Sequence, residues 1–478
     1  MRLACLLLLF VPFLSAAERP NLVVILCDDL GYGDLGCYGH PHIKTPNLDQ
    51  LASDGIRFTS FYSTAPVCSP SRVGLLTGRS PNRAGVFDWI PASGGKRRPD
   101  AREQVHMRRE EITIAHLLKK AGYATCMSGK WHCNSQFNNA GQPQPGDAGF
   151  DHWFGTQNNA APSHENPRNY VRNGKAVGDL EGYSCQLAVD EVIRWLERPT
   201  DKTQPFFVYL AFHEPHEPVA SPPDLVARYK NVAKTTDEAQ YFANVHNLDT
   251  AVGRLLKHLD QTQQRENTLI VFTSDNGPET LNRYRSANRS YGRPGPLRGM
   301  KLHTHDAGFR VAGIMNWKEH IKPGQVSAEP VSALDLLPTF CELAKTKPPT
   351  NRQLDGTNFL PALRGRAIDR EPLIWCYFNA LNESRVAMRY GDFKVLARMN
   401  NVRRMSNVTT RQLPILKKVE LTGFEIYDVT KDIGESKNLL GLNAARDKKF
   451  QSLLQKQYDE LLAGSHIWTP ASGAGAKK

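Results

Sequence analysis

The chain has 478 residues, of which 40% are hydrophobic and 23% are charged, and its formal net charge is +12. These are globular values that allow a sizeable core. The basic balance suits a polyanionic partner, but no nucleic-acid-binding motif accompanies it, so we expect no binding to nucleic acid. The nine cysteines form neither CxxC pairs nor a zinc pattern, which excludes a disulfide framework or zinc module.

The first residues have the pattern of a secretory signal. Arg2 supplies one positive charge, an apolar run extends from Leu3 to Leu14, and small residues follow at 15–17. The run is too short to span a bilayer, and no later stretch reaches transmembrane length. We therefore predict that residues 1–17 are a cleaved signal peptide, and that the mature protein is exported to the periplasm or secreted without stable membrane insertion.

Four apolar runs further along end abruptly in polar residues, as buried strands of a parallel sheet do. They end at Asp28 and Asp29, at Lys130 and His132, at His213 and His216, and at Asp275 and Asn276. Helix-like stretches alternate with them, at residues 45–55, 110–123, 183–197 and 237–261. This alternation predicts an α/β fold with a large, mostly parallel central sheet flanked by helices. Because ligands bind beyond the carboxyl ends of such strands, the four ends are expected to share one site.

The sequence pattern changes after about residue 365. Short strand-like runs follow, and residues 444–464 form one amphipathic, helix-like stretch. This pattern predicts a smaller C-terminal α+β domain packed on the first. We divide the mature chain into a large α/β domain at residues 18–365, the C-terminal subdomain at 366–465 and a tail at 466–478, which we expect to be disordered.

The segment APVCSPSRVGLLTGR, residues 65–79, places Cys68, Pro70 and Arg72 in the spacing C-x-P-x-R, just before a helix-like stretch. With this motif the sequence resembles the formylglycine-dependent sulfatases of the alkaline-phosphatase-like superfamily. The resemblance extends from Asn21 to about Leu440 and includes SALDLLPTF, LDGTNFLPAL and FEIYDVTKDIGESKNL. In that family a separate formylglycine-generating enzyme oxidises the cysteine to formylglycine (3-oxoalanine), an aldehyde.

The resemblance implies a nucleophile made from Cys68. One hydroxyl of the hydrated aldehyde attacks the sulfur of a sulfate ester, and the other then loses its proton so that sulfate is expelled. A serine could not release sulfate in this way, so Ser69 and Ser71 are poor candidates and are expected to serve the turn and the helix start. The following helix would direct N–H groups at the anion.

Hard oxygen ligands cluster at two of the strand ends. Asp28, Asp29, Asp275 and Asn276 suit Ca²⁺ first and Mg²⁺ second, rather than zinc. Each short motif alone is more often a turn, but together, beside C-x-P-x-R, they favour a metal site. The resemblance assigns these four residues and the modified Cys68 to one calcium ion, which would lower the pKa of the diol hydroxyl and neutralise sulfate oxygens.

The resemblance also gives roles to four further side chains. Arg72 would hold the diol and the oxygens on the metal side, and His132, in GKWH, would contact the diol. Lys130, in the same motif, matches a sulfate-binding lysine, and Lys301, in LRGMK, matches a second one. Together with the nucleophile, these residues would surround the sulfate group with positive charge.

One assignment has a close rival, and one segment departs from the family pattern. His216, in PHEP, matches the histidine that protonates the leaving alcohol, but HEPHEP offers His213 in the same setting. After Lys301 the sequence reads LHTHDAGFRVAGIM, where relatives usually show a Glu-Gly-Gly pair of turns. Asp306 and Ala307 suggest the same loop with altered packing.

The sequence therefore predicts an exported sulfatase that releases inorganic sulfate from esters, with a sulfated carbohydrate as the expected substrate. The alternatives are a phosphonate or phosphodiester hydrolase of the same superfamily, and a catalytically silent glycan-binding homologue. Phosphatases of this fold use Ser or Thr as the nucleophile and hold two zinc ions, which need more histidine and aspartate ligands than the sequence offers. The near-complete set of motif residues speaks against a silent protein.

A long polar and aromatic segment, residues 134–170, separates two of the predicted strands. It contains Trp153, Asn158, Asn159 and His164. Such side chains either contact sugar hydroxyls and stack on ring faces, or belong to a purely structural loop. Since specificity in such folds depends on loops outside the reacting centre, the sequence leaves both interpretations open.

Overall fold

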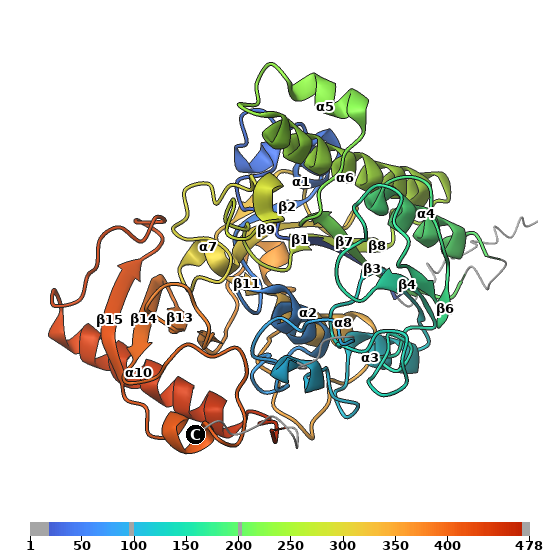
Figure 1. Cartoon of the computed structure of the whole chain (residues 1–478). Coiled ribbons are helices and arrows are strands. Elements are labelled where there is room, and N and C mark those ends of the chain that lie inside the picture. Colours follow the sequence, from blue (N-terminus) through green and yellow to red (C-terminus); the bar gives the residue numbers. More distant parts are fainter. Residues whose placement is uncertain (1–18, 95–99, 199–202, 471–478) are drawn as a thin grey trace, which may run out of the picture.

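The computed structural model describes residues 19–94, 100–198 and 203–470 (Figure 1). The predicted signal peptide and most of the predicted tail lie outside these residues. None of the described helices combines the length and the apolar character that a membrane span requires. The eight cysteines in the described part are free thiols, so no disulfide links them.

A large twisted sheet forms the centre of the molecule (Figure 1). Its strand order is β10-β2-β9-β8-β1-β7-β3-β4-β5-β6, and β11 pairs with β2. The strands are β1 (Asn21–Asp28), β2 (Ile56–Tyr62), β3 (Ala124–Lys130), β4 (His152–Thr156), β5 (Val171–Arg172), β6 (Lys175–Ala176), β7 (Phe206–Pro215), β8 (Thr268–Ser274), β9 (Arg310–Asn316), β10 (Gln325–Ser327) and β11 (Val331–Ser332). Strands β8, β1, β7, β3 and β4 run parallel, whereas β9 is antiparallel to β8 and β2. The prediction of a mostly parallel sheet is confirmed.

The four strands with polar ends are neighbours in the middle of this sheet. Cys27 of β1 lies opposite Ser274 of β8, and Leu26 of β1 and Gly129 of β3 both lie opposite Ala211 of β7. Because the strands are parallel and in this register, the residues that follow them emerge at one edge. The expected convergence of the four ends is therefore present.

Helices cover both faces of the sheet. On one face lie α1 (Pro46–Ser53), α4 (Ser184–Leu196), α5 (Pro223–Tyr229) and α6 (Thr236–Gln261); on the other lie α2 (Cys68–Thr77), α3 (Ile114–Lys120) and α8 (Leu336–Leu343). Alternate residues of β1 serve the two cores, with Val23 and Ile25 facing the first helix layer and Leu22 and Val24 the second. This explains why the strand reads as an unbroken apolar run.

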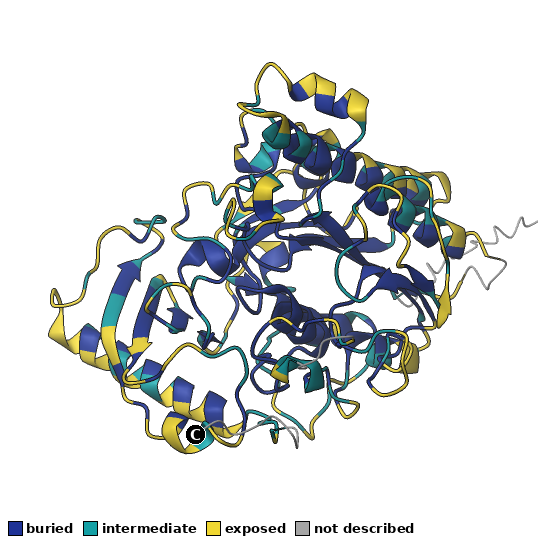
Figure 2. Ribbon diagram, viewed as in Figure 1, coloured by how far each residue is buried: buried dark blue, intermediate teal, exposed yellow. Residues whose placement is uncertain are grey.

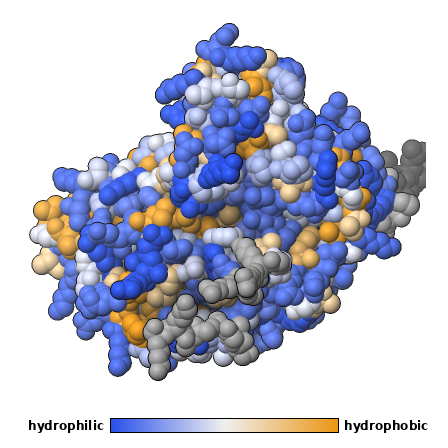
Figure 3. Space-filling model, viewed as in Figure 1, coloured by the Kyte–Doolittle hydropathy of each residue, from blue (hydrophilic) through white to orange (hydrophobic). Residues whose placement is uncertain are grey.

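The helix α2 is unusual because all ten of its residues are buried (Figure 2). Its first residue, Cys68, therefore reaches the sheet edge from inside the protein. By contrast, α6 and α10 (Ala444–Ala463) expose one side to solvent, as their amphipathic sequences predict. On the face in Figure 3 hydrophilic residues predominate, and hydrophobic residues form only small groups.

The C-terminal part forms a second sheet beside the first domain (Figure 1). Its four antiparallel strands are β12 (Leu373–Cys376), β13 (Val386–Tyr390), β14 (Phe393–Met399) and β15 (Leu421–Asp428), in that order. Helix α10 packs on it through residues such as Leu454 and Tyr458. Short helices α7 (Asp306–Phe309) and α9 (Leu413–Leu416) complete the described elements longer than one 3₁₀ turn. A smaller α+β unit after the large α/β domain is thus present.

Candidate active site

A buried cluster of charged and metal-ligating side chains lies where β1, β8 and α2 meet. Asp28 and Asp29 follow β1, and Cys68 opens α2. Their potential ligand atoms, together with one from His216, all lie within 4.8 Å of one another, and all four residues are buried. The sheet edge thus holds a compact group of the kind that binds a cation.

Asp29 connects this group to the end of β8. It adopts a left-handed backbone conformation, with φ of 64°, and its N–H donates to Asp275 Oδ1 at 3.3 Å. Asn276 Nδ2 donates to Asp29 Oδ1 at 2.6 Å, and Lys301 Nζ donates to Oδ2 at 2.7 Å. A non-glycine residue held in this region is a local strain that other contacts must stabilise, and such strain is common at functional sites.

Two buried cations fix the remaining carboxylates. Arg72 Nε donates to Asp275 Oδ2 at 2.9 Å, and its Nη1 donates to the Lys130 carbonyl at 2.9 Å. Lys130 Nζ lies 2.5 Å from Asp28 Oδ2. The side chains of Arg72 and Lys130 are both 0% exposed. The structure therefore joins the carboxylates, Asn276, Arg72, Lys130 and Lys301 in one buried network beside Cys68 and His216.

The protonation tendencies of the three carboxylates differ. Burial raises the pKa of Asp29 to about 7, despite Lys301. Burial and the neighbouring Asp28 raise the pKa of Asp275 to about 7, despite Arg72. Burial would also raise the pKa of Asp28, but Lys130, His216 and Arg72 hold it well below its usual value. Two of the three carboxylates thus lack enough positive charge around them.

The cluster also contains oxygens that no described residue satisfies. Asp28 Oδ1 and Asn276 Oδ1 are buried and have no hydrogen-bond partner among the described residues. Buried polar atoms are nearly always paired, so unpaired carboxylate and amide oxygens need an explanation such as an ion. Oxygen donors of this type are what hard divalent cations prefer. The residues present therefore fit a hard cation, since Asp28 and Asn276 each offer an unpaired oxygen beside the carboxylate of Asp29.

Cys68 lies at the buried start of α2, against Val67, Leu302 and Tyr377. Burial raises the pKa of its thiol well above the usual value, so the unmodified side chain is a neutral thiol and a weak nucleophile. The helix begins at Cys68 itself, after Val67, and no side chain caps it. Ser69 and Ser71 lie in the first turn of this helix, and Ser69 Oγ accepts the N–H of Ile90 at 2.9 Å.

His132 has one ring nitrogen free to face the site. Its φ is 53°, its Nε2 contacts the Ile90 carbonyl at 2.9 Å, and its buried Nδ1 has no partner among the described residues. Burial, together with Lys130 and Arg72, lowers its pKa well below the usual value. The ring is therefore neutral, donates through Nε2, and presents Nδ1 as an acceptor.

The two histidines of HEPHEP have different surroundings. Both ring nitrogens of His213 contact hydroxyl groups: Nε2 lies 2.7 Å from Thr156 Oγ1, and Nδ1 lies 3.2 Å from Tyr170 Oη. His216 instead has Nε2 3.6 Å from Asp29 Oδ2. The geometry favours His216 over His213, because only the His216 ring faces the carboxylate cluster.

Comparison with known proteins agrees with this arrangement. The sequence model of the sulfatase family matches residues 20–346, and the model described as N-sulphoglucosamine sulphohydrolase, C-terminal, matches residues 300–463. Human arylsulfatase A is 35% identical over 95% of this chain and 90% of its own length. The chain belongs to the sulfatase family.

Another relative and a solved structure also match most of this sulfatase. Rat N-acetylgalactosamine-6-sulfatase is 35% identical over 80% of this chain and 72% of its own length. The crystal structure of Ps i-CgsB in complex with k-i-k-neocarrahexaose is 27% identical, with a TM-score of 0.77, and the match covers 95% of this chain and 96% of that one. The protein is a sulfuric ester hydrolase with the fold of solved sulfatases.

The long segment between β3 and β7 approaches the sulfatase site through amide side chains and not through its tryptophan. Trp153 lies on β4, is only 7% exposed and packs on Phe137 in the core, so it offers no face for a sugar ring. Asn158 and Asn159 follow β4, and their buried Oδ1 atoms have no partner among the described residues. Because the adjacent Gln157 carbonyl accepts the His132 N–H at 2.7 Å, these amides lie near the site.

The C-terminal domain adds a wall to the sulfatase site that the sequence did not predict. Tyr377 Oη donates to Asp88 Oδ1 at 2.8 Å, and Asn379 Nδ2 donates to Asp88 Oδ2 at 2.9 Å. The N–H of Leu381 donates to the Leu302 carbonyl at 2.9 Å, next to Lys301. No local motif marks these residues, since the contacts to Asp88 join segments almost 300 positions apart in the chain.

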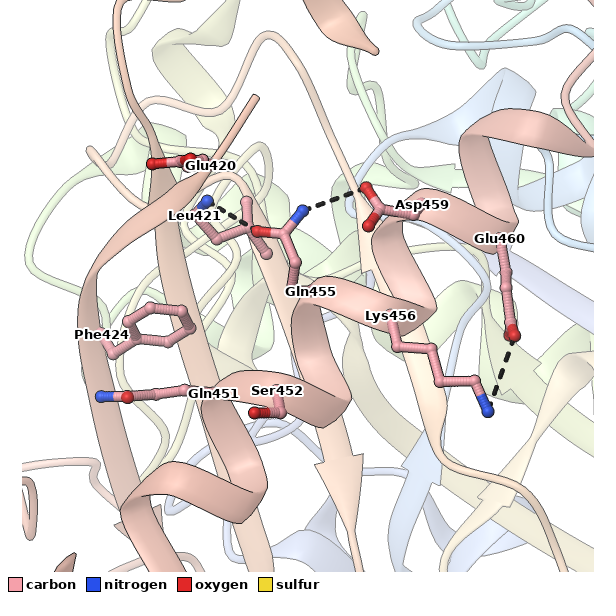
Figure 4. Close-up of a pocket in the computed structure, with 9 residues that line it drawn as sticks. All are labelled: Glu420, Leu421, Phe424, Gln451, Ser452, Gln455, Lys456, Asp459 and Glu460. Atoms are coloured by element: carbon pink, nitrogen blue, oxygen red, sulfur yellow. Dashed lines mark hydrogen bonds and ion pairs between the residues drawn. The ribbon is translucent and has the colours of Figure 1, made fainter. Parts of the chain in front are cut away.

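A groove elsewhere on the sulfatase has no such chemistry. It has a volume of about 640 Å³ and lies between β15 and α10 (Figure 4). Its polar side chains bond to one another: Gln455 accepts the Leu421 N–H and donates to Asp459, and Lys456 pairs with Glu460. None of its nine lining residues is a cysteine or histidine, so the buried cluster at the sheet edge remains the candidate active site.

Proposed function

We propose that this sulfatase removes sulfate from esters on a sulfated carbohydrate, using formylglycine formed from Cys68 as the nucleophile and one calcium ion. The observation that carries the proposal is the position of Cys68. The cysteine of C-x-P-x-R opens a buried helix directly against Asp28 and Asp29. A neutral buried thiol is unsuited to attack sulfur, whereas a hydrated aldehyde at the same position supplies a hydroxyl nucleophile.

The balance of charge supports a divalent cation in addition to the protein's own cations. Three carboxylates, of Asp28, Asp29 and Asp275, are paired with three cations, of Arg72, Lys130 and Lys301. The protein alone therefore provides no surplus positive charge for a sulfate ester anion. Calcium held by these carboxylates and by Asn276 would supply that charge and acidify the nucleophilic hydroxyl; magnesium is the second choice.

The remaining residues would bind the sulfate and move protons. Lys130 and Lys301 direct buried ammonium groups into the cluster and would bind sulfate oxygens. His132 presents Nδ1 as an acceptor and would take a hydrogen bond from the nucleophile. His216 would give a proton to the leaving oxygen. Arg72 would hold the carboxylates and the nucleophile in place.

The names of similar proteins support a carbohydrate substrate. One relative is a sulfatase of N-acetylgalactosamine 6-sulfate, and one structural neighbour was solved with a neocarrahexaose. The unpaired amide oxygens of Asn158 and Asn159 would suit sugar hydroxyls. We further propose that the protein is exported after loss of residues 1–17, that a formylglycine-generating enzyme matures it, and that residues 18–365 and 366–465 are its catalytic domain and C-terminal subdomain.

Mass spectrometry of the peptide bearing Cys68, from protein made in its native host, tests the nucleophile. Conversion of the thiol to an aldehyde is expected, and an unmodified thiol in active protein would contradict the proposal. Release of sulfate and of phosphate from matched aryl esters tests the reaction. Faster release of phosphate would favour a phosphoryl hydrolase. A phosphoryl hydrolase with two metal ions would need a second group of metal ligands, whereas one such group is found among the described residues.

A further inference from the structure

A buried glutamate lies directly behind the ring of His216. The Glu217 side chain is 2% exposed, and its Oε2 lies 3.1 Å from His216 Nδ1. The same Nδ1 lies 2.8 Å from the Glu217 backbone carbonyl. Two acceptors from one residue thus face one ring nitrogen, while the other, Nε2, points toward Asp29 at 3.6 Å.

The carboxylate of Glu217 is itself held by two fixed donors. Ser290 Oγ donates to its Oε1 at 2.7 Å, and Tyr284 Oη donates to its Oε2 at 2.9 Å. Both donors come from the segment between Asn276 and Lys301, which also carries Glu279, 3.5 Å from Lys301 Nζ. Because both of its oxygens are engaged, the carboxylate can turn only if these bonds break.

This arrangement decides which nitrogen of His216 does which task. Since a carbonyl and a carboxylate both accept hydrogen bonds, Nδ1 must carry a hydrogen. The atom left to face the reacting group is therefore Nε2. A ring that also carries a proton on Nε2 is a cation, and the adjacent carboxylate offsets its charge.

We propose that Glu217 is a positioning residue for the leaving-group step: it orients His216 so that Nε2 delivers a proton to the departing oxygen. In that step a bond forms from sulfur to the attacking oxygen, whose proton passes to the His132 Nδ1 left unpaired among the described residues, as the bond from sulfur to the leaving oxygen breaks. The electron pair of the broken bond stays on the leaving oxygen, which takes the proton from Nε2. This inference rests on the proposed function, because it assigns His216 as the proton donor.

The neighbouring His213 provides an internal contrast. Its two ring nitrogens contact the hydroxyls of Thr156 and Tyr170, which can each donate or accept. Hydroxyl partners fix neither the tautomer nor a charge, so His213 lacks the arrangement that a proton donor needs. The carboxylate behind His216 thus gives an independent reason why one histidine of HEPHEP works and the other does not.

The test compares aryl sulfates with different leaving groups. A 4-nitrophenolate leaves readily without a proton, whereas phenolate is more basic and benefits from one. Glu217→Gln keeps the size and removes the charge; we expect kcat/KM to fall at least about 10-fold for phenyl sulfate and about 2-fold or less for 4-nitrophenyl sulfate. Tyr284→Phe removes one hydrogen bond to Glu217 and should give a smaller change with the same dependence on the leaving group.

Glu279→Gln is the matched control, because it also removes a buried charge near Lys301 but does not contact His216. It should affect both esters by the same factor. If Glu217→Gln also slows both esters equally, Glu217 is only structural and the inference is wrong. Should Glu217→Gln fail to fold by thermal melting, Tyr284→Phe decides alone. If the unaltered enzyme releases no sulfate from either ester, the proposed function fails instead.

Discussion

Two buried clusters of oppositely charged side chains lie on either side of the loop that follows Lys301. They differ in whether all of their oxygens have partners. The site cluster consists of Asp28, Asp29, Asp275, Arg72, Lys130 and Lys301. The interface cluster consists of Asp306, Arg310, Lys394 and Glu435, and it joins α7 and β9 to the C-terminal sheet. Both are excluded from solvent, yet only the first has the properties of an active site.

Every carboxylate oxygen of the interface cluster has a partner. Lys394 Nζ lies 2.7 Å from Asp306 Oδ1 and 3.3 Å from Glu435 Oε1. Arg310 Nη1 lies 3.1 Å from Asp306 Oδ2, and the N–H of Asp306 donates to Glu435 Oε2 at 2.7 Å. The ammonium also lies 4.4 Å from the centre of the Phe309 ring. The loop after Lys301 thus places Asp306 in a closed structural network.

The shifts in pKa do not separate the two clusters. Burial raises the pKa of Glu435 to about 7 in the interface cluster, as it does for Asp29 and Asp275 in the site cluster. Unpaired oxygens do separate them, because Asp28 in the site cluster and the adjoining Asn276 each keep one buried oxygen without a hydrogen-bond partner among the described residues. The nearest cation that pairs with that Asp28 oxygen, Arg72 Nη2, is 3.7 Å away. A saturated network stabilises the fold, whereas an unsaturated one is prepared for a ligand.

The largest expected effect comes from removing the nucleophile beside the site cluster, which should stop the reaction and leave the fold intact. Cys68→Ala should lower the rate of sulfate release at least about 1,000-fold, since the nucleophile is lost. The thermal unfolding midpoint should change little, because only one small side chain is shortened. Cys341→Ala, a buried cysteine in the core far along the chain, is the control and should keep its activity. Retained turnover in Cys68→Ala would refute the assignment of the nucleophile.

The next largest effect is expected from a substitution that disrupts the interface cluster. Lys394→Met would leave Asp306 and Glu435 buried without their shared cation, so we expect the free energy of unfolding to fall by about 3–5 kcal/mol. Denaturant unfolding measures this loss. Lys431→Met is the control, since Lys431 pairs with Asp428 but its side chain is 83% exposed, and it should change the stability little. Equal effects of the two substitutions would contradict the distinction.

Removing the proposed calcium ion tests directly whether the unpaired oxygens of the site bind a cation. Treatment with a chelator should lower sulfate release about 10- to 100-fold and lower the unfolding midpoint, because a ligand bound only to the folded state stabilises it. Added calcium should restore both, and magnesium should do so less well. The stability lost in Lys394→Met should not depend on the metal, because every carboxylate oxygen of the interface cluster already has a partner. An enzyme that keeps full activity after complete removal of metal would exclude a catalytic cation.

The smallest effect concerns the link between the two domains at the site. Tyr377→Phe removes the hydrogen bond to Asp88 and should raise KM a few-fold while destabilising the protein by about 1–2 kcal/mol, since a buried carboxylate oxygen then keeps only the Trp89 N–H as donor. Steady-state kinetics and thermal melting measure the two changes. Tyr390→Phe, on the outer part of β13, is the control. A change in kcat alone would show that Tyr377 does more than shape the wall.

Much of this protein could be predicted from local sequence. The four polar strand ends, the helices between them and the C-x-P-x-R segment are each determined within about 15 residues. Parallel pairing then forces Asp28, Lys130, His216 and Asp275 to one edge of the sheet. Cys68 could be recognised because its motif lies within a single turn and helix start. The two histidines of HEPHEP, by contrast, look alike in sequence, and only their contacts separate them.

The sequence by itself determined which chemical groups the site contains, because strand periodicity and short motifs are local properties of the chain. The tertiary structure alone decided how those groups are completed: Glu217 behind His216, Tyr377 on Asp88, and Trp153 inside the core rather than on the surface. The contact of Tyr377 with Asp88 joins segments far apart in the chain, and Glu217, although next to His216 in sequence, is held by the distant Tyr284 and Ser290. The energies of such contacts depend on burial and on which partner fills each lone pair. No local pattern carries that information.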